Sequence, residues 1–300
     1  MIERRPFFDG FVTHQVQVEG ASIHAEVGGR GPALLLLHGY PQTHVAWHRV
    51  VHALAEHYTV VAADLRGYGD STGPAGDLQH INYSKRTVAL DQVQLMRALG
   101  FERFAVIGHD RGGRVAYRLC LDHPETVTGF VSVTVIPTQD MWDKSNMAFG
   151  MKAFHWFLFA QPFDMPERLL QSDPAYFLDW TLANMAPKPG TISAEALAEY
   201  HRAFARPSVR HAMIEDYRAA ADIDLAHDKA DLEGGRRITC PVQMLWCGPA
   251  VPSPHPVDIW KKWAEDVEGV AINSGHMVAE EAPHEFLAAV LPFLDRCWRK

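Results

Sequence analysis

Short aliphatic runs, spaced along the chain with room for a helix between them, constrain the fold most strongly. Four of these runs are residues 33–37, 59–63, 104–107 and 127–135. A strand that is apolar at every position is buried on both faces, which is typical of a parallel sheet covered by helices. Helical patterns at 83–99 and 112–122 lie between these runs. The sequence therefore predicts an α/β fold with a mostly parallel central sheet, preceded by short strands at 12–18 and 22–27.

The alternation of strands and helices stops in the middle of the chain and resumes near its end. Residues 137–236 are rich in aromatic side chains and predict helices and loops without strands. The elements expected after this segment are a strand at 241–247, a helix at 258–268, a strand at 270–273 and a helix at 280–298. We therefore expect a core domain formed by 1–136 and 237–300, interrupted by a helical cap at 137–236.

Charge and cysteine content exclude several classes of protein. The formal net charge is −8 without a long basic run, so neither nucleic acid nor an anionic membrane surface is an expected partner. The four cysteines lack the spacing of metal-binding pairs, and the N-terminus has no apolar segment typical of a signal peptide. No stretch approaches the ~18 apolar residues of a membrane span. We expect a soluble, cytoplasmic protein.

The most informative motif is VIGHDRGG at residues 106–113, placed between a predicted strand and a predicted helix. The form G-x-nucleophile-x-G at such a place indicates a nucleophile elbow, here with Asp110 as the nucleophile. The turn is so tight that side chains at positions 108 and 112 would collide with neighbouring backbone, which explains the glycines. The helix that follows directs its N–H groups at the site. The alternative is an ordinary glycine-rich turn with a solvated aspartate.

Two further motifs occur where this architecture needs them. HGYP at 38–41 follows a buried strand, and in an elbow site the N–H groups of Tyr40 and Arg111 would form the oxyanion hole. His276 lies between the last strand and the last helix, in the chain order expected of a general base. Alone, each has an ordinary alternative, a strand-end turn or one structural histidine among seventeen.

Together these motifs resemble the α/β-hydrolase superfamily over nearly the whole chain. An aspartate nucleophile is typical of its haloalkane dehalogenases, soluble epoxide hydrolases and haloacetate dehalogenases. The segments that resemble fluoroacetate dehalogenases in particular are 38–44, 47–48, 109–114, 155–156, 215–218 and 274–276. Arg111, directly after the nucleophile, discriminates best, because epoxide hydrolases commonly carry an aromatic residue there.

The resemblance implies a two-step reaction on a short haloacid such as fluoroacetate or chloroacetate. Asp110 would displace the halide and form an ester, which a water activated by His276 would hydrolyse. Arg111 and Arg114 would hold the substrate carboxylate through forked hydrogen bonds. No metal or organic cofactor is implied, and the expected ligand is a small anion. Members of this family are often dimers, so we expect that the chain can form a homodimer.

Three cap residues would hold the departing halide. The resemblance places His155, Trp156 and Tyr217 at these positions, each with a ring N–H or hydroxyl donor. The alternatives are that His155 and Trp156 belong to the cap core and that Tyr217 lies on a helix surface. Arg114, taken alone, could equally be a surface cation.

The chain departs from the family at the acid that orients the catalytic histidine. Thr134 stands at the family's acid position, and no carboxylate follows the next strand at 245–250. Asp140 and Asp258 are the nearest alternatives. Because loss of such an acid slows the histidine-dependent step by orders of magnitude, we expect slow ester hydrolysis unless another group orients His276.

Further open points concern the cap and the type of reaction. Met185 stands where the family typically has a tryptophan, for which Trp180 could substitute. A soluble epoxide hydrolase would instead need a tyrosine to protonate the epoxide oxygen, and the cap offers Tyr176, Tyr200 and Tyr217. A protein that binds carboxylates without turnover is the third alternative.

Overall fold

The computed structural model describes residues 7–248 and 252–299. Its centre is an eight-stranded sheet in the order β1-β2-β4-β3-β5-β6-β7-β8. The strands are β1 (Val12–Val18), β2 (Ala21–Gly29), β3 (Ala33–Leu37), β4 (Thr59–Ala63), β5 (Phe104–His109), β6 (Val127–Val133), β7 (Val242–Cys247) and β8 (Val267–Ile272). β1 pairs antiparallel with β2, and β2 pairs antiparallel with β4. All other pairs are parallel, as the apolar runs predicted.

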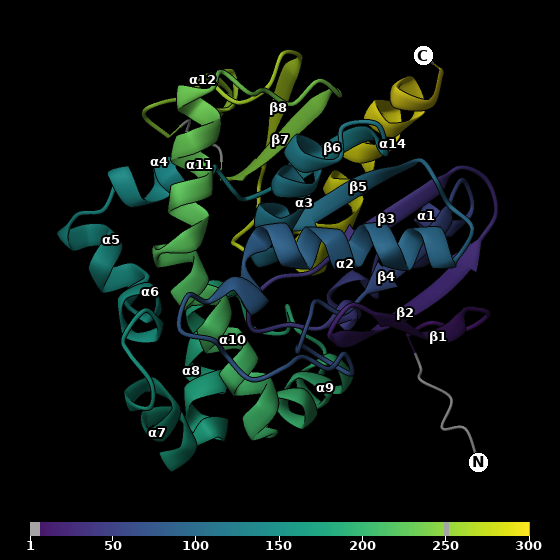
Figure 1. Cartoon of the computed structure of the whole chain (residues 1–300). Helices are drawn as coiled ribbons and strands as arrows, with labels where there is room; N and C mark the ends of the chain where they lie inside the picture. The colour runs from purple at the N-terminus through teal and green to yellow at the C-terminus, as the bar shows by residue number, and fades with distance from the viewer. Residues whose placement is uncertain (1–6, 249–251, 300) are drawn as a thin grey trace.

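Helices cover both faces of this sheet (Figure 1). The helices from the core segments are α1 (Val51–Ala55), α2 (Lys85–Ala98), α3 (Arg111–Asp122), α12 (Pro256–Trp260), α13 (Val278–Glu281) and α14 (Pro283–Arg299). Short 3-10 helices are η1 (His44–Trp47) and η2 (Ile81–Tyr83). Helices α2 and α3 pack on each other and on one face of the sheet, while α14 packs on β6 and β8 with α1 beside it. β3 and β5 are buried at every residue, as their composition requires.

The segment between β6 and β7 is helical, as predicted. Its helices are α4 (Thr138–Asp143), α5 (Met147–Lys152), α6 (Phe154–Phe159), α7 (Met165–Ser172), α8 (Pro174–Met185), α9 (Ala194–Phe204), α10 (Pro207–Ala221) and α11 (Ile223–Glu233). They gather beside and below the sheet in Figure 1. Tyr40, just after β3, packs against His155 and Phe159 of α6, so these helices cover the carboxyl end of the central strands. The domain boundaries themselves stay a prediction.

Three predicted elements differ in extent from the structure. The helix expected at 258–268 spans only Pro256–Trp260, because the next residues pair with a distant segment. Ile238 donates to the carbonyl of Trp263 and accepts from Glu265, which draws this stretch out of the helix. β8 consequently begins at Val267 rather than at 270.

The strand expected at 127–135 also ends early, at Val133. Thr134 has a left-handed backbone with φ of 61°, which terminates the strand. No helix in the described part of the chain is long and apolar enough to cross a membrane.

Candidate active site

Asp110 lies at the junction of β5 and α3 in a backbone conformation that non-glycine residues rarely adopt. Its φ is 47° and its ψ is −115°. A Cβ on Gly108 would lie 2.6 Å from the carbonyl oxygen of Gly112, and a Cβ on Gly112 would lie 2.3 Å from that of Leu37. The glycines therefore fill the steric role that the sequence predicted. The tight turn presents Asp110 at the carboxyl end of β5, in the middle of the sheet.

One carboxylate oxygen of Asp110 is held by the backbone of the loop after β3. The N–H of Tyr40 donates to Oδ1 of Asp110 at 2.9 Å. A Cβ on Gly39 would lie 2.3 Å from Cβ of Asp110, so only glycine lets this loop approach. Arg111, the other predicted donor, occupies the first residue of α3. The arrangement fixes Oδ1 and leaves Oδ2 facing another partner.

That partner is His276. Its Nε2 lies 3.6 Å from Oδ2 of Asp110. The carboxylate of Glu281 braces the histidine loop, because it accepts from the N–H groups of Gly275 and Met277, both at 2.9 Å. Nε2 of His109 contacts the carbonyl oxygen of His276 at 2.9 Å. The general base predicted from chain order therefore lies beside the predicted nucleophile.

The surroundings keep Asp110 ionised. Burial alone would raise the pKa of its carboxyl, but the ion pair with His276 and the charge of Arg111 hold that pKa well below its usual range. Burial lowers the pKa of His109 to about 3, so that imidazole is neutral near pH 7. An ionised carboxylate at an elbow is suited to nucleophilic attack.

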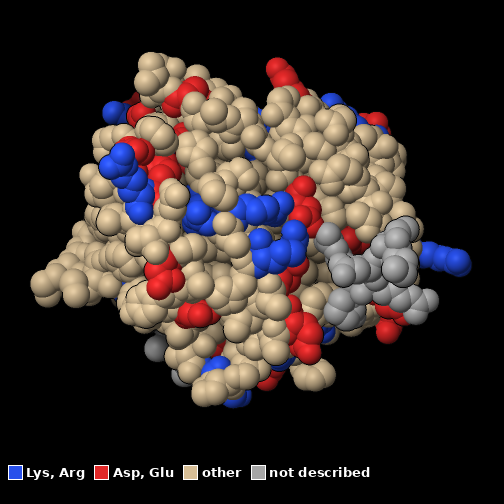
Figure 2. Space-filling view, turned by 90° about the horizontal axis from the view of Figure 1, so that it is seen from below, with Lys and Arg blue, Asp and Glu red and all other residues tan. Residues whose placement is uncertain are grey.

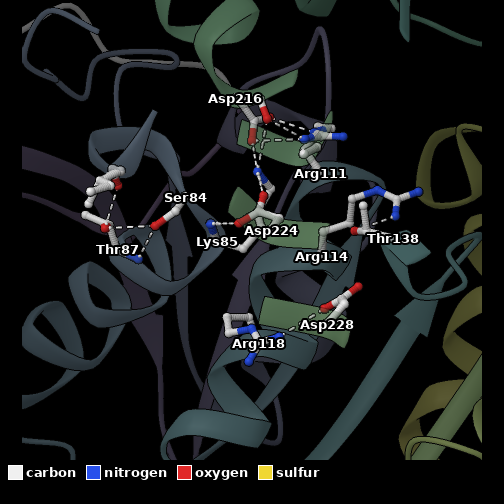
Figure 3. Close-up of polar contacts among 12 residues, drawn as sticks. Ser84, Lys85, Thr87, Arg111, Arg114, Arg118, Thr138, Asp216, Asp224 and Asp228 are labelled. Carbon is white, nitrogen blue, oxygen red and sulfur yellow. Dashed lines mark hydrogen bonds and ion pairs between the residues drawn. The ribbon is translucent and has the colours of Figure 1, made fainter. Parts of the chain in front are cut away.

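Two buried arginines, Arg111 and Arg114, project from α3, which begins directly after Asp110 (Figure 3). Arg111 donates from Nε and Nη2 to Asp216, and its Nη1 is buried without a hydrogen-bond partner in the described residues. Arg114 donates from Nη1 to Thr138 Oγ1 at 3.0 Å and to Ile136 O at 3.3 Å, and its Nε is unpartnered in the same sense. Buried donors almost always have an acceptor, so these nitrogens point to an anionic ligand.

Aromatic side chains from the inserted helices close the site. His155 stacks on Tyr40 with ring centroids 5.3 Å apart, and Tyr217 packs edge-on against both. The guanidinium of Arg111 lies 4.1 Å from the Tyr217 ring centroid, and that of Arg114 lies 4.6 Å from the Trp156 ring centroid. The three predicted halide donors thus come together next to the arginines, in a site with little exposed surface.

The titration behaviour of these donors suits hydrogen bonding to an anion. The Tyr217 hydroxyl is buried without a partner among the described residues. Burial and the charge of Asp110 raise the pKa of Tyr217 well above its usual range, so its proton is retained. Burial lowers the pKa of His155 to about 4, so its ring is neutral near pH 7. Both side chains can donate without adding charge.

Sequence comparison places this geometry in a family. The alpha/beta hydrolase fold family matches residues 32–283. The chain belongs to the α/β-hydrolase family. It is 39% identical over 292 residues to a fluoroacetate dehalogenase from Burkholderia sp., covering 96% of this chain and 95% of that one. It is 33% identical over 288 residues to a soluble epoxide hydrolase from Corynebacterium sp. (strain C12), covering 93% and 96%.

Two similar solved structures carry the name of epoxide hydrolases rather than of dehalogenases. A chain from Pseudomonas aeruginosa named a "putative epoxide hydrolase" is 51% identical with a TM-score of 0.94, covering 98% of both chains. A threonine-to-aspartate mutant under the same name, with bound MFA, is 52% identical with a TM-score of 0.93, covering 98% of this chain and 99% of that one.

The carboxylates considered as substitutes for the missing acid lie elsewhere in this α/β hydrolase. Asp140 accepts from the indole of Trp263 at 2.7 Å and pairs with Lys262 at 2.9 Å. Asp258 is largely exposed and pairs with Lys261. In residues 7–248 and 252–299, the ion pair of His276 is with Asp110 alone. Neither alternative therefore orients His276.

Thr134 lies next to the elbow of the hydrolase without a hydrogen bond from its hydroxyl. The N–H of Asp110 donates to the carbonyl of Val133 at 3.4 Å, and the N–H of Thr134 donates to Leu245 at 2.8 Å. Oγ1 of Thr134 is buried and unpartnered within the described chain. The position is therefore adjacent to the site but offers no carboxylate.

The structure decides between the alternatives that the sequence left open for the cap tyrosines and for Trp180. Tyr176 is 66% exposed, and the Tyr200 hydroxyl is bonded to Glu280 and Gln42, so only Tyr217 of the three candidates reaches the cluster around Asp110. Trp180 is 41% exposed and packs on Phe154.

Met185 itself reaches the histidine loop. Its carbonyl accepts from the N–H of His276 at 3.2 Å. Trp180 is engaged with Phe154 on the outer part of the insertion and does not take this place. The position that the sequence identified as a departure therefore contacts His276 through its backbone.

Sequence reasoning missed two acidic residues at the site. Asp216 precedes Tyr217 directly and pairs with Arg111, and Glu281 braces the loop of His276. Adjacency to predicted site residues was the only available signal. Three groups of histidines and carboxylates in the described chain lie close enough to share a cation, and none includes Asp110 or His276. These groups are His24–Glu26–His44, His24–Asp64–Asp70 and Glu167–His211–Glu215.

Proposed function

We propose that this hydrolase is a haloacetate dehalogenase that converts fluoroacetate or chloroacetate to glycolate and halide. The observation that carries the proposal is a pair of buried guanidinium nitrogens beside the ionised carboxylate of Asp110. These nitrogens, on Arg111 and Arg114, have no hydrogen-bond partner in the part of the chain that the structure describes. A substrate carboxylate supplies the acceptors these donors lack. The 39% identical fluoroacetate dehalogenase supports the same substrate class.

In the first step, Oδ2 of Asp110 attacks the halogen-bearing carbon. The carbon–oxygen bond forms as the carbon–halogen bond breaks, and the electron pair leaves with the halide. His155, Trp156 and Tyr217 donate hydrogen bonds to the departing ion, which matters most for fluoride because it is a poor leaving group. In-line displacement requires these donors to bind the halide on the side of the carbon opposite Oδ2 of Asp110.

In the second step, His276 removes a proton from water, and the hydroxide attacks Cγ of Asp110. The negative charge that develops on Oδ1 is stabilised by the N–H of Tyr40, which already donates to that oxygen, and by the N–H of Arg111. As the tetrahedral intermediate collapses, the departing glycolate oxygen takes the proton from His276, and loss of the remaining proton to solvent restores the Asp110 carboxylate. Because Thr134 cannot stabilise the imidazolium, we propose that this step limits turnover.

Single turnover in ¹⁸O-labelled water tests the proposal. Chloroacetate or fluoroacetate should release halide and leave one labelled oxygen in the Asp110 carboxyl, found by mass spectrometry of the peptide. Asp110→Asn should release no halide. Halide release with all of the label in glycolate would mean direct attack by water and would overturn the mechanism.

The second candidate function is soluble epoxide hydrolysis. The buried and unpartnered Tyr217 hydroxyl could protonate an epoxide oxygen, and the Corynebacterium relative is a soluble epoxide hydrolase. Arg114→Met separates the two functions, because a neutral epoxide does not need the cation. Loss of halide release with retained epoxide hydrolysis would identify Arg114 as the carboxylate-specific group. Acetate binding without turnover of either substrate would favour the third reading, a carboxylate-binding protein.

A further inference from the structure

The two site arginines differ in how their charge is balanced. Arg111 forms an ion pair with Asp216, with Nε 2.6 Å from Oδ2 and Nη2 3.1 Å from Oδ1, and Nη2 also donates to the Asp216 carbonyl at 2.8 Å. Arg114 bonds only to uncharged oxygen atoms, the carbonyl of Ile136 and the hydroxyl of Thr138. Thr138 in turn contacts the hydroxyl of Tyr117. Arg114 is therefore the arginine without a counter-charge in direct contact among the described residues.

Asp216 is itself the centre of a buried network that joins the inserted helices to the core (Figure 3). Lys85, at the start of α2, pairs with Asp216 and also with Asp224 at 3.2 Å. The Tyr68 hydroxyl donates to Asp216 at 2.9 Å. The two acids balance the charges of Lys85 and Arg111. All of these side chains are buried, so their mutual interactions are weakly screened.

The network also fixes the plane of the Arg111 guanidinium. Asp216 holds Nε and Nη2, the Tyr217 ring lies 4.1 Å from the guanidinium carbon, and Nη1 is the nitrogen left without a partner. Burial and the charge of Arg111 lower the pKa of Arg114, as expected of two cations close together on one helix. An anion bound between them would relieve that repulsion.

We propose that Asp216 is a positioning and specificity-determining residue: it directs Nη1 of Arg111 at the substrate carboxylate while cancelling that arginine's charge, so that Arg114 alone supplies the attraction for the anion. The proposal rests on the function proposed above. It has a chemical rationale, because substrate and glycolate product are both carboxylates. Two unbalanced buried cations would bind both tightly without lowering the barrier, and would slow product release.

The test compares Asp216→Asn with Glu215→Gln. Glu215 is the neighbouring buried carboxylate on α10, but it pairs with Arg218 and His80. Acetate, which cannot react, serves as the binding probe in calorimetry, and steady-state halide release from chloroacetate gives kcat and KM. Circular dichroism checks that each variant is folded.

Asp216→Asn should bind acetate about tenfold more tightly, because removal of one buried negative charge strengthens the anion's attraction to Arg111. It should lower KM and also kcat, since Arg111 loses its fixed orientation. Glu215→Gln should change neither. A merely structural role for Asp216 would weaken acetate binding or raise KM, and either result overturns the proposal.

Lys85→Met provides a second variant with the opposite expected sign. Removal of this cation leaves Asp216 with excess negative charge, so acetate binding should weaken while Arg111 stays paired. If Asp216→Asn does not fold, unchanged or tighter acetate binding in Lys85→Met overturns the proposal by itself.

The wild-type protein distinguishes failure of this inference from failure of the proposed function. Acetate binding without halide release contradicts the proposed function and still allows the two variants to test the role of Asp216. Halide release with unchanged acetate affinity in both variants contradicts only the inference. A wild-type protein that does not bind acetate contradicts both.

Discussion

Thr134 is the residue that most distinguishes this site from a complete dehalogenase triad. Its hydroxyl is buried without a partner among the described residues, and its φ of 61° is one that aspartate tolerates better than a β-branched residue. Thr134→Asp should therefore raise kcat for chloroacetate by about tenfold or more, because a carboxylate would stabilise the His276 imidazolium. Steady-state halide release measures this.

The matched control is Thr134→Val, which keeps the β-branch and adds no charge. It should leave kcat within about twofold of wild type, because the hydroxyl makes no hydrogen bond to lose. A Thr134→Asp variant that folds but turns over no faster would mean that His276 is oriented by another group.

Tyr217 gives a second prediction at the scale of a single residue. Tyr217→Phe removes the unpartnered hydroxyl and keeps the ring that packs on Arg111. Halide release from fluoroacetate should fall by about 100-fold, and release from chloroacetate by much less, because fluoride depends more on donated hydrogen bonds.

The rate ratio for the two substrates is the measurement. Tyr83→Phe is the control, because its hydroxyl donates to the Pro74 carbonyl at 2.7 Å, outside the aromatic cluster of the site. An equal loss on both substrates in Tyr217→Phe would show that Tyr217 does not bind the halide.

At the scale of elements, the short helix α13 joins the histidine loop to the inserted helices. Glu280 on α13 is buried and accepts from Gln42 Nε2 at 2.6 Å and from the Tyr200 hydroxyl of α9 at 3.2 Å. Burial raises the pKa of Glu280 from 4.5 to about 8. Protonated Glu280 therefore stabilises the fold below pH 4.5, and this contribution is lost as the pH rises through 8.

Glu280→Gln should remove that pH dependence. Relative to wild type, the Tm of the variant should rise by about 3 °C or more between pH 5 and pH 9, which thermal unfolding at the two pH values measures. Glu285→Gln, at an exposed site one turn away on α14, should show no such change. A constant difference in Tm between wild type and Glu280→Gln would show that Glu280 does not titrate in this range.

The elements also show where sequence reasoning succeeds and where it fails. β3 and β5 were predictable because strands buried on both faces must be apolar throughout. The elbow was predictable because it requires glycine at two positions, where a Cβ would lie 2.3–2.6 Å from backbone atoms. The predicted extent of the helix at 258–268 was wrong because Ile238, distant in sequence, supplies competing backbone hydrogen bonds.

The two acids that support the site, Asp216 and Glu281, could not be predicted, because long-range contacts determine their roles. Asp216 and Glu281 act through partners from other segments, and no local pattern in the sequence encodes those contacts. The candidate nucleophile Asp110 and the candidate base His276 could be predicted because a motif and the chain order mark them. The groups that orient them could not.

For the whole molecule, we propose that the chain forms a homodimer through the inserted helices. Large apolar side chains are exposed there, among them Met147 at 85%, Met151 at 77% and Phe163 at 71%. The view from below in Figure 2 shows a group of basic side chains with acidic ones beside them. Light scattering should give the mass of a dimer, and Met147→Lys with Met151→Lys should shift it toward a monomer. A monomeric wild-type protein at high concentration would contradict the proposal.

The most direct test of the central claim is the number of halide ions released per active site from excess chloroacetate, with mass spectrometry of Asp110 during the reaction. We predict a rapid release of about one equivalent, a slower steady release, and an ester on Asp110. No halide release and no adduct on Asp110, while a neutral epoxide is hydrolysed, would contradict it.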